Sequence, residues 1–181
     1  MTIVLETERL LFRRLVPDDL DDLFALYRDP EIRRHFPEGT LTYEETRDEL
    51  EFFLNGHPDH PELGLWATIC KENSRFIGRC GLLPWTIGGR ADVEVAYLLA
   101  KEYWGRGLGT EAAQGIVRYA VERLHLSRLI CVVSPGNLAS AKVARNIGMT
   151  LEAEMEDEDG PFLLYSMRAV WDAPGEPRSP S

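Results

Sequence analysis

The sequence predicts an α/β fold, and three stretches near its centre carry the prediction. Residues 93–99 (VEVAYLL) have the β-branched and aliphatic composition of a strand. Residues 112–124 carry apolar side chains at the spacing of one helix face. Residues 129–133 (LICVV) form a fully apolar run of strand length. A strand, a helix and a second strand in this order are typical of an α/β unit.

Local signals place the other elements in chain order. Pro17 opens a helix that ends near Asp29-Pro30, because the residue before a proline resists the α region. Thr42 and Glu45 have the spacing of a capping box, which starts a second helix. The expected strands are residues 8–15, 65–70, 76–82, 93–99, 129–133, 151–155 and 162–170. The expected helices cover residues 17–29, 42–54, 112–124 and 137–147.

Length and composition indicate one globular domain. A chain of 181 residues with 44% hydrophobic and 28% charged residues can bury one substantial core. We expect this domain to span residues 1–172, with no second domain and no internal repeat. Residues 173–181 are expected to be a disordered tail, because residues 174–181 carry no apolar side chain.

Charge and hydropathy exclude several classes of protein. The net charge of −10 disfavours non-specific nucleic-acid binding, which relies on a basic surface, and would attract a cationic substrate instead. No apolar run is long enough to cross a membrane, and residues 1–10 lack the pattern of a secretory signal. We therefore expect a cytoplasmic protein that partners neither nucleic acid nor membrane.

The cysteines and histidines predict no metal site. Cys70, Cys80 and Cys131 lie in apolar runs without metal-type spacing, so they are expected to be buried thiols in a reducing compartment. The four histidines are scattered and form no ligand pair with one another.

A glycine-rich turn at residues 103–110 (YWGRGLGT) predicts an anion site. It leads into the helix at residues 112–124, where the first backbone N–H groups lack intrahelical partners. Gly105, Gly107 and Gly109 carry no Cβ, so a ligand can approach the backbone closely. Free N–H groups and the positive end of the helix dipole suit a phosphate or pyrophosphate, and Arg106 adds a positive charge.

Spacing separates three phosphate-binding designs. A P-loop needs a Gly-Lys-Ser/Thr triplet, which the chain lacks. Gly107-x-Gly109-x-x-Ala112 matches the dinucleotide fingerprint on paper, but residues 100–104 separate it from its strand and no acidic residue ends the next strand. The third design is the pyrophosphate loop for acetyl-CoA.

Residues 91–112 resemble motif A of the GNAT superfamily of N-acetyltransferases. The superfamily pattern is Gln/Arg-x-x-Gly-x-Gly/Ala, and Trp104 occupies its first position here. The segment from Asn137 to Met149 resembles the "Asn-x-x-Ser…Gly-Phe" segment of the RimJ/RimL branch, with Met149 in place of the usual aromatic residue. Residues 8–13 and 76–78 resemble the opening and third strands of that branch. The resemblance covers roughly residues 6–171.

The resemblance implies a GNAT fold, acetyl-CoA as co-substrate and no metal. The implied sheet is mixed and mostly antiparallel, with six to seven strands, two splayed parallel strands and about four flanking helices. The residues implied to bind acetyl-CoA are Tyr97, Leu98, Leu99, Trp104, Gly105, Arg106, Gly107, Leu108, Gly109, Thr110, Asn137, Ser140 and Lys142. Lys101 and Arg145 could add positive charge near the anion.

Catalytic candidates follow from the same resemblance. Glu94 is the candidate general base, because partial burial would raise the pKa of its carboxyl group towards neutrality. It could instead only fix a loop or bind the acceptor ammonium. Ser140 is the candidate acid for the departing thiolate, with Asn137 beside it, although both residues also suit an ordinary helix start. We expect sequential transfer without an acetyl-enzyme, so Cys131 is not a nucleophile.

Three functions are compatible with the sequence. The first is acetylation of a protein N-terminal α-amine, as on a ribosomal protein. The second is acetylation of a small amine such as an aminoglycoside or polyamine, and the third is CoA binding without turnover. His35, Phe36 and Trp85 are candidates for the acceptor pocket, although residues 32–40 could equally be a packed loop and Trp85 could instead close the end of the core. The oligomeric state, monomer or homodimer, stays open.

Overall fold

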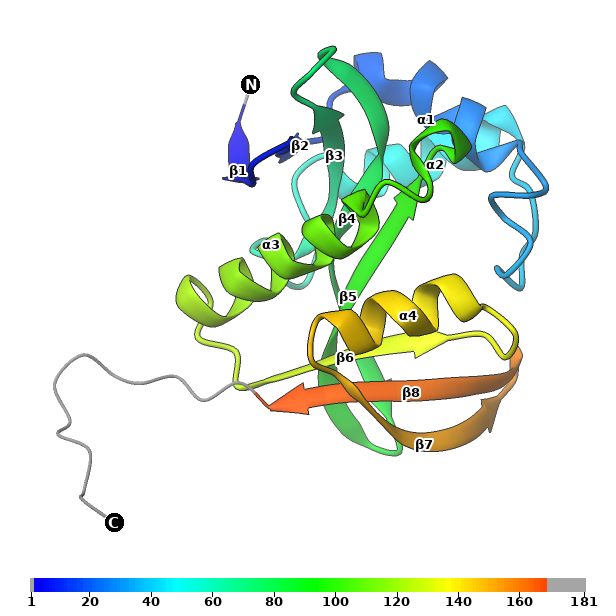
Figure 1. The fold of residues 1–181 in the computed structure, drawn as a ribbon. Helices are drawn as coiled ribbons and strands as arrows, with labels where there is room; N and C mark the ends of the chain where they lie inside the picture. Colours follow the sequence, from blue (N-terminus) through cyan, green and yellow to red (C-terminus); the bar gives the residue numbers. More distant parts are fainter. Residues whose placement is uncertain (1, 169–181) are drawn as a thin grey trace, which may run out of the picture.

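Figure 1 shows the fold in a computed structural model, which describes residues 2–168. Eight strands form one sheet in the order β1-β2-β3-β4-β5-β6-β8-β7. The strands are β1 (Ile3–Glu6), β2 (Leu10–Arg14), β3 (Gly64–Cys70), β4 (Arg75–Ile87), β5 (Arg90–Leu99), β6 (Arg128–Val133), β7 (Thr150–Asp157) and β8 (Gly160–Arg168). The α-helices of the described residues are α1 (Leu20–Tyr27), α2 (Tyr43–Phe53), α3 (Leu108–Glu122) and α4 (Leu138–Asn146), with 3-10 turns at Pro17–Asp19 and Lys101–Tyr103. The predicted α/β fold is confirmed.

The sheet divides between β5 and β6. Every other neighbouring pair is antiparallel, whereas β5 and β6 run parallel and are joined at a single residue pair, Glu94 with Ile130. Beyond that pair the two strands diverge towards their C-terminal ends, as Figure 1 shows. The divergence opens a gap inside a continuous sheet, and the two splayed parallel strands implied by the resemblance are present.

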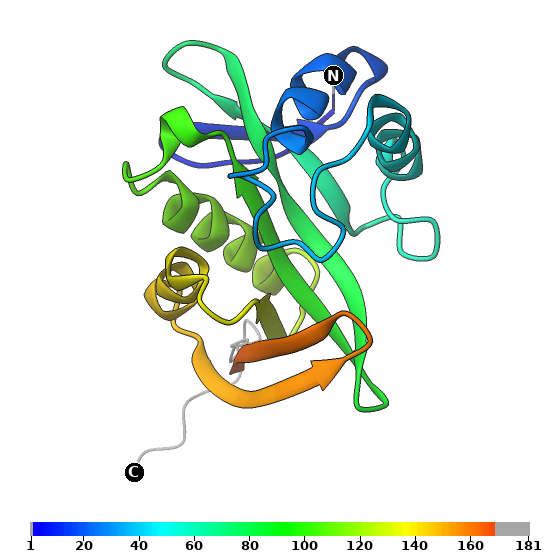
Figure 2. The ribbon, with the colours of Figure 1, turned by 90° about the vertical axis from the view of Figure 1, so that its right-hand side faces the viewer.

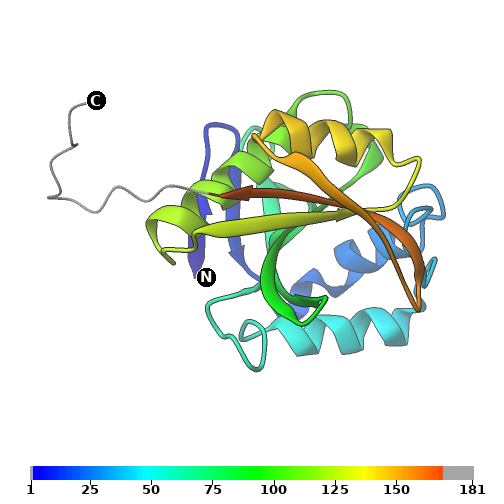
Figure 3. The ribbon, with the colours of Figure 1, turned by 90° about the horizontal axis from the view of Figure 1, so that it is seen from below.

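Helices cover both faces of the sheet. Figures 2 and 3 show α3 and α4 on one face and α1 and α2 on the other. Successive strand residues point to opposite faces, so Val95 packs with the α3 and α4 side, while Ala96 packs with the α1 and α2 side. By the same alternation, Glu94 faces the side of Ala96.

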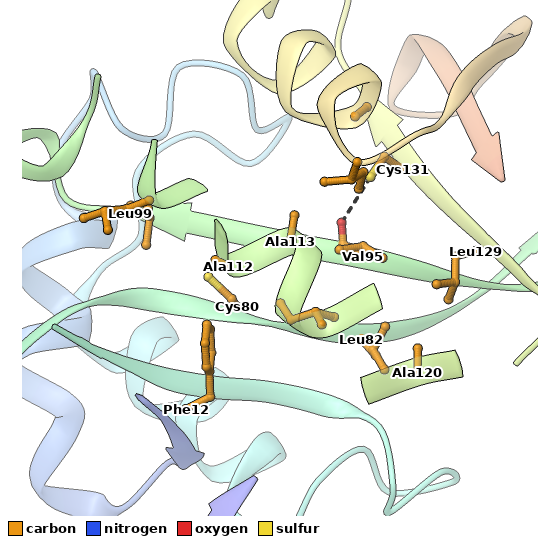
Figure 4. Close-up of a cluster of buried hydrophobic side chains, with 14 of the residues drawn as sticks. Phe12, Cys80, Leu82, Val95, Leu99, Ala112, Ala113, Ala120, Leu129 and Cys131 are labelled. Carbon is orange, nitrogen blue, oxygen red and sulfur yellow. Dashed lines mark hydrogen bonds between the residues drawn. The ribbon is translucent and has the colours of Figure 1, made fainter. Parts of the chain in front are cut away.

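Small side chains let α3 lie close to the sheet. Ala112, Ala113 and Ala120 are fully buried and pack with strand residues such as Leu82 and Leu129 in one core cluster (Figure 4). Cys70, Cys80 and Cys131 are buried free thiols, so their predicted burial is confirmed.

The sequence missed β1. One strand is predicted over residues 8–15, whereas the structure has a hairpin in which β2 pairs with β1 on its outer side. β1 has four partly exposed residues at the edge of the sheet and lacks the alternation that marks a half-buried strand.

Two other elements extend beyond their predicted limits. Strand β4 continues through Pro84 to Ile87, because β3 pairs with it only as far as Leu82 and the proline meets no second neighbour. Helix α3 starts at Leu108, so Gly109 and Thr110 belong to its first turn.

Some expectations fall beyond the described part of the chain. The domain end at residue 172, the tail 173–181 and the last residues of the final strand lie outside residues 2–168. Within residues 2–168, no helix combines the length and apolar character that a membrane crossing requires.

Candidate active site

A cavity of about 470 Å³ lies where β5 and β6 separate. Its walls come from the α1–α2 loop, β4, β5, β6, the start of α4 and the β7–β8 hairpin. The sequence-predicted residues that line it are Glu94, Tyr97, Asn137, Ser140, His35, Phe36 and Trp85. The structure therefore brings the catalytic candidates and the acceptor-pocket candidates together in one cavity.

Glu94 is a partly buried carboxylate held by two donors. Its Oε2 accepts a hydrogen bond from the indole N–H of Trp85 at 2.7 Å, and its Oε1 accepts one from the backbone N–H of Val132 at 3.3 Å. The pKa of Glu94 is raised to about 7. Loss of solvation is the largest cause and outweighs the two hydrogen bonds and the positive charge of Arg79, which lower the pKa. Near neutral pH this group can therefore both accept and release a proton.

The opposite wall is the first turn of α4. Asn137 caps this helix, because its side-chain oxygen accepts the backbone N–H of Ser140 at 3.1 Å. The Tyr97 hydroxyl donates to the backbone carbonyl of Ser140 at 3.1 Å, which joins β5 to α4 across the gap. The hydroxyl of Ser140 forms no hydrogen bond to any other described residue, so it is free to donate into the cavity.

The glycine-rich turn lies at the C-terminal end of β5 and not in the cavity wall. Gly105 and Gly107 have φ angles of 73° and 77°, a backbone region that side chains rarely adopt. Gly107 is the N-cap of the 15-residue helix α3, and a Cβ built on Gly105 would meet nothing within 4 Å. This open backbone at a helix N-terminus fits the predicted pyrophosphate site.

Other residues predicted to bind acetyl-CoA near this turn differ in burial and in their contacts. Leu98 and Leu99 are buried, and the carbonyl of Leu99 accepts the indole N–H of Trp104 at 2.8 Å. The guanidinium of Arg106 lies 5.3 Å from the ring centroid of Tyr103.

Basic residues near the turn differ in their freedom to bind an anion. Lys142 is exposed. Lys101 pairs with Asp29 at 2.9 Å and with Glu31 at 3.0 Å, so its charge is already matched. Arg145 donates to the Tyr165 hydroxyl at 3.2 Å.

Sequence reasoning missed Arg9 and Glu111. The Arg9 guanidinium donates to the backbone carbonyl of Arg106 at 3.0 Å and pairs with Glu111 at 2.6 Å. Glu111 also accepts the hydroxyl of Thr7. These contacts tie the β1–β2 turn to the start of α3 and hold the glycine-rich turn in place. A long-range contact of this kind leaves no local signal in the sequence.

Several charged residues that line the cavity were also missed. They are Arg33, Glu49 and Arg79, together with the exposed Asp157 and Asp159 of the β7–β8 hairpin. A charged residue in the apolar run of residues 76–83 (FIGRCGLL) is the signal that could have identified Arg79.

A loop contact closes one side of the cavity. The hydroxyl of Ser134, just after β6, donates to the backbone carbonyl of His35 at 2.7 Å. It fixes the α1–α2 loop beside Phe36, so both acceptor-pocket candidates of that loop face the same space as Glu94.

Comparison with known proteins assigns the family. A model of the acetyltransferase (GNAT) domain matches residues 9–150. The uncharacterized N-acetyltransferase p20 of Bacillus licheniformis is 30% identical over 155 residues, which cover 84% of this chain and 85% of that protein.

Solved structures share the fold. An acetyltransferase from Agrobacterium tumefaciens superposes with a TM-score of 0.77 at 27% identity, covering 92% of this chain and 94% of its own. RimL, a ribosomal L7/L12 α-N-protein acetyltransferase solved with coenzyme A, superposes with a TM-score of 0.77 at 18% identity, covering 94% and 99% of the two chains. With its splayed strands, its glycine-rich turn and a matching domain model over most of its length, the chain belongs to the GNAT family of acetyltransferases.

Proposed function

We propose that this N-acetyltransferase transfers the acetyl group of acetyl-CoA directly to the α-amine at the N-terminus of a polypeptide. One observation carries the proposal. Glu94 on β5 and Ser140 on α4 face one cavity from opposite sides of the gap between β5 and β6. An acyl donor that enters along this gap would place its reacting carbon between a group that can take a proton and a group that can give one.

The residues present suit the two halves of the reaction. Acetyl-CoA, when bound, supplies an acetyl thioester. Glu94, through a water molecule, takes the proton of the incoming ammonium so that nitrogen can attack the thioester carbon. The C–N bond forms as the C–S bond breaks. The Ser140 hydroxyl gives its proton to the departing sulfur and regains one from the nitrogen, which loses its second proton as the neutral amide forms. A backbone N–H between Tyr97 and Leu99 is the proposed donor to the thioester oxygen.

The glycine-rich turn is the proposed binding site for the pyrophosphate of acetyl-CoA. Its residues Gly105 to Thr110 present backbone N–H groups, and Arg106 and exposed Lys142 add positive charge. RimL, which shares the fold, is solved with coenzyme A and supports the choice of co-substrate.

Two guanidinium groups line one part of the cavity. Those of Arg33 and Arg79 would repel the second cationic group of an aminoglycoside or polyamine placed beside them, whereas a peptide brings one terminal ammonium, which the carboxylates of Glu49 and Glu94 in the same lining can attract. The acidic hairpin residues Asp157 and Asp159 can attract the N-terminal ammonium at the rim.

Replacing Ser140 with alanine tests its proposed role as the acid. The variant should bind acetyl-CoA with unchanged affinity and turn over roughly 10- to 100-fold more slowly, because a positioned acid contributes at least that much. Titration calorimetry gives the affinity, and CoA release gives the rate. The matched control is Ser127→Ala, at an exposed serine outside this cavity, which should behave like the wild type. A fully active Ser140→Ala enzyme would leave Ser140 with a structural role alone.

Replacing Gly105 with alanine tests the acetyl-CoA site. A side chain at a φ of 73° strains the turn and intrudes on the open backbone, so the KM for acetyl-CoA should rise about tenfold, or 1.4 kcal/mol of binding free energy. Gly88 is a matched control at the β4–β5 turn, with positive φ and open space around it. Gly88→Ala should show similar backbone strain with no change in KM. Equal effects on KM would place acetyl-CoA elsewhere.

Acceptor screening tests the proposed function. CoA thiol release is measured with acetyl-CoA against three pools, namely short peptides with free N-termini, aminoglycosides and polyamines. We expect turnover with peptides, and mass spectrometry should place the acetyl group on the α-amine. Turnover confined to the other pools would overturn the peptide assignment. Acetyl-CoA binding with no turnover on any amine would indicate a CoA-binding module without catalysis.

A further inference from the structure

Arg79 is a buried cation with unused hydrogen-bonding capacity. It lies on β4 inside the apolar run, and only 6% of its surface is exposed. Its Nε donates to the Tyr27 hydroxyl at 2.9 Å. No other described residue hydrogen-bonds to its two terminal nitrogens, and no described carboxylate forms an ion pair with it. Because Arg79 lines the cavity, those terminal nitrogens are available to a ligand there.

The nearest negative charge is already engaged. Glu49 of α2 accepts the hydroxyl of Tyr27 in a short hydrogen bond, so it is linked to Arg79 only through that tyrosine. Burial raises the pKa of Tyr27, which keeps its hydroxyl protonated as the donor to Glu49. Glu49, which also lines the cavity, is therefore linked to Arg79 only through Tyr27, and the two terminal nitrogens of the guanidinium keep no described hydrogen-bond partner.

A second guanidinium adds to the positive character of this wall. The guanidinium of Arg33 lies 4.1 Å from the ring centroid of Phe36, and that of Arg79 lies 5.6 Å from it. Arg33 donates to the carbonyl of Gly39 at 2.7 Å and meets the exposed carboxylate of Glu38 only at 3.4 Å. The stacking on Phe36 fixes both side chains, so the wall is preorganised for an anion.

This wall shares the cavity with the reacting groups. Arg79 is near enough to Glu94 for its charge to lower the pKa of that carboxyl group. Because both residues line one cavity, a ligand whose amine reaches Glu94 can present an anionic group to Arg79. Planar guanidinium groups bind carboxylates through two parallel hydrogen bonds, which matches the two unused nitrogens of Arg79.

We propose that Arg79 determines acceptor specificity by binding a carboxylate of the acceptor. This inference rests on the proposed acetyl transfer to an amine, and an effect confined to the free-amino-acid arm would replace the polypeptide as the proposed acceptor. The acceptor is a primary amine that carries a carboxylate close to its nitrogen. Two sources supply that chemistry: a free amino acid, through its α-carboxylate, and a polypeptide whose first residue has an acidic side chain.

Paired acceptors test this inference and separate the two sources. The free-amino-acid arm compares L-alanine with L-alaninamide, and the peptide arm compares C-terminally amidated peptides that begin with Glu or with Gln. The readout is the ratio of kcat/KM for the carboxylate over that for the amide. Differences in amine basicity cancel when this ratio is compared between enzyme variants.

In one of the two arms we expect Arg79→Gln to lower this ratio about 10- to 100-fold relative to the wild type, the range for a hydrogen-bonded charge pair. The matched control is Arg75→Gln, at an exposed arginine on the same strand, which should leave the ratio at the wild-type value. The ratio is insensitive to a loss of folded enzyme, because both acceptors are measured on one preparation.

A ratio that Arg79→Gln leaves unchanged in both arms would overturn the inference and leave the proposed function intact. Absence of transfer to every amine would refute the proposed function. Equilibrium binding of the same acceptor pairs to the protein with CoA then decides the inference, which fails if the carboxylates bind no tighter than the amides.

Discussion

Replacing Glu94 with glutamine is expected to lower kcat by about 100-fold or more and to remove its rise with pH, because a positioned general base contributes roughly that factor. Burial raises the pKa of Glu94 to about 7. The carboxyl group loses its proton as pH rises through that value, so wild-type kcat should increase across about pH 6 to 8, with its midpoint near 7, and level off above about 8. Glutamine has no titrating proton, so the profile of the variant should lack this step. Saturating acceptor keeps substrate binding out of the comparison.

A substitution at Trp85 provides a second test of the role of Glu94. Its indole N–H lowers the pKa of Glu94 by stabilising the carboxylate at 2.7 Å. Trp85→Phe removes that donor and leaves an aromatic ring, so the midpoint of the kcat profile should move to higher pH. A merely structural Glu94 would give no such movement. If Glu94→Gln retained the wild-type step, or Trp85→Phe left the midpoint in place, another group would be the base.

Replacing Asp92 with alanine is expected to lower the free energy of unfolding by about 3 kcal/mol, the cost of breaking a buried ion pair from one side. The Asp92 side chain is only 1% exposed and lies two residues before Glu94. Its carboxylate accepts from Arg128 of β6 at 2.7 Å and from Arg90 at 2.9 Å. Both arginines also pair with Glu152 of β7. The network clamps β5 to β6 just below the point where they separate.

Urea denaturation at pH 7 measures this effect, and an exposed ion pair supplies the control. Arg47 and Glu44 pair at 3.1 Å on the outer surface of α2, where water screens the charges. Glu44→Ala should therefore leave the urea midpoint unchanged. An Asp92→Ala variant as stable as the wild type would mean that the pairing of β5 with β6 does not depend on the network.

Local signals explain which parts of the fold the sequence predicts. Thr42 and Glu45 form the expected capping box, and Asn137 caps α4, because a helix start depends on residues within one turn. The glycine-rich turn is equally local, since Gly105 and Gly107 need their own backbone conformations. Strand β1 lacks such a signal, because its pairing with β2 alone makes it a strand.

The same distinction between local and long-range signals applies to the candidate active site. Glu94 and Ser140 could be named from a family resemblance, and the structure brings them to one cavity, while their catalytic roles remain predictions. Arg79 could not be ranked from sequence alone, because its importance depends on Tyr27 and Glu49, which come from α1 and α2. The link between Ser134 and His35 joins residues 99 positions apart. Contacts between side chains that are far apart in the sequence can be identified only from the folded structure.

The kinetic pattern of the reaction tests the central claim most directly. Initial rates of CoA release are measured over a grid of acetyl-CoA and acceptor concentrations, and the intact mass of the enzyme is recorded with acetyl-CoA alone. Direct transfer within one cavity predicts intersecting double-reciprocal lines and an unmodified enzyme. Parallel lines together with an acetylated enzyme would contradict the account, because the acetyl group would then pass through a residue such as Cys131 before it reaches the amine.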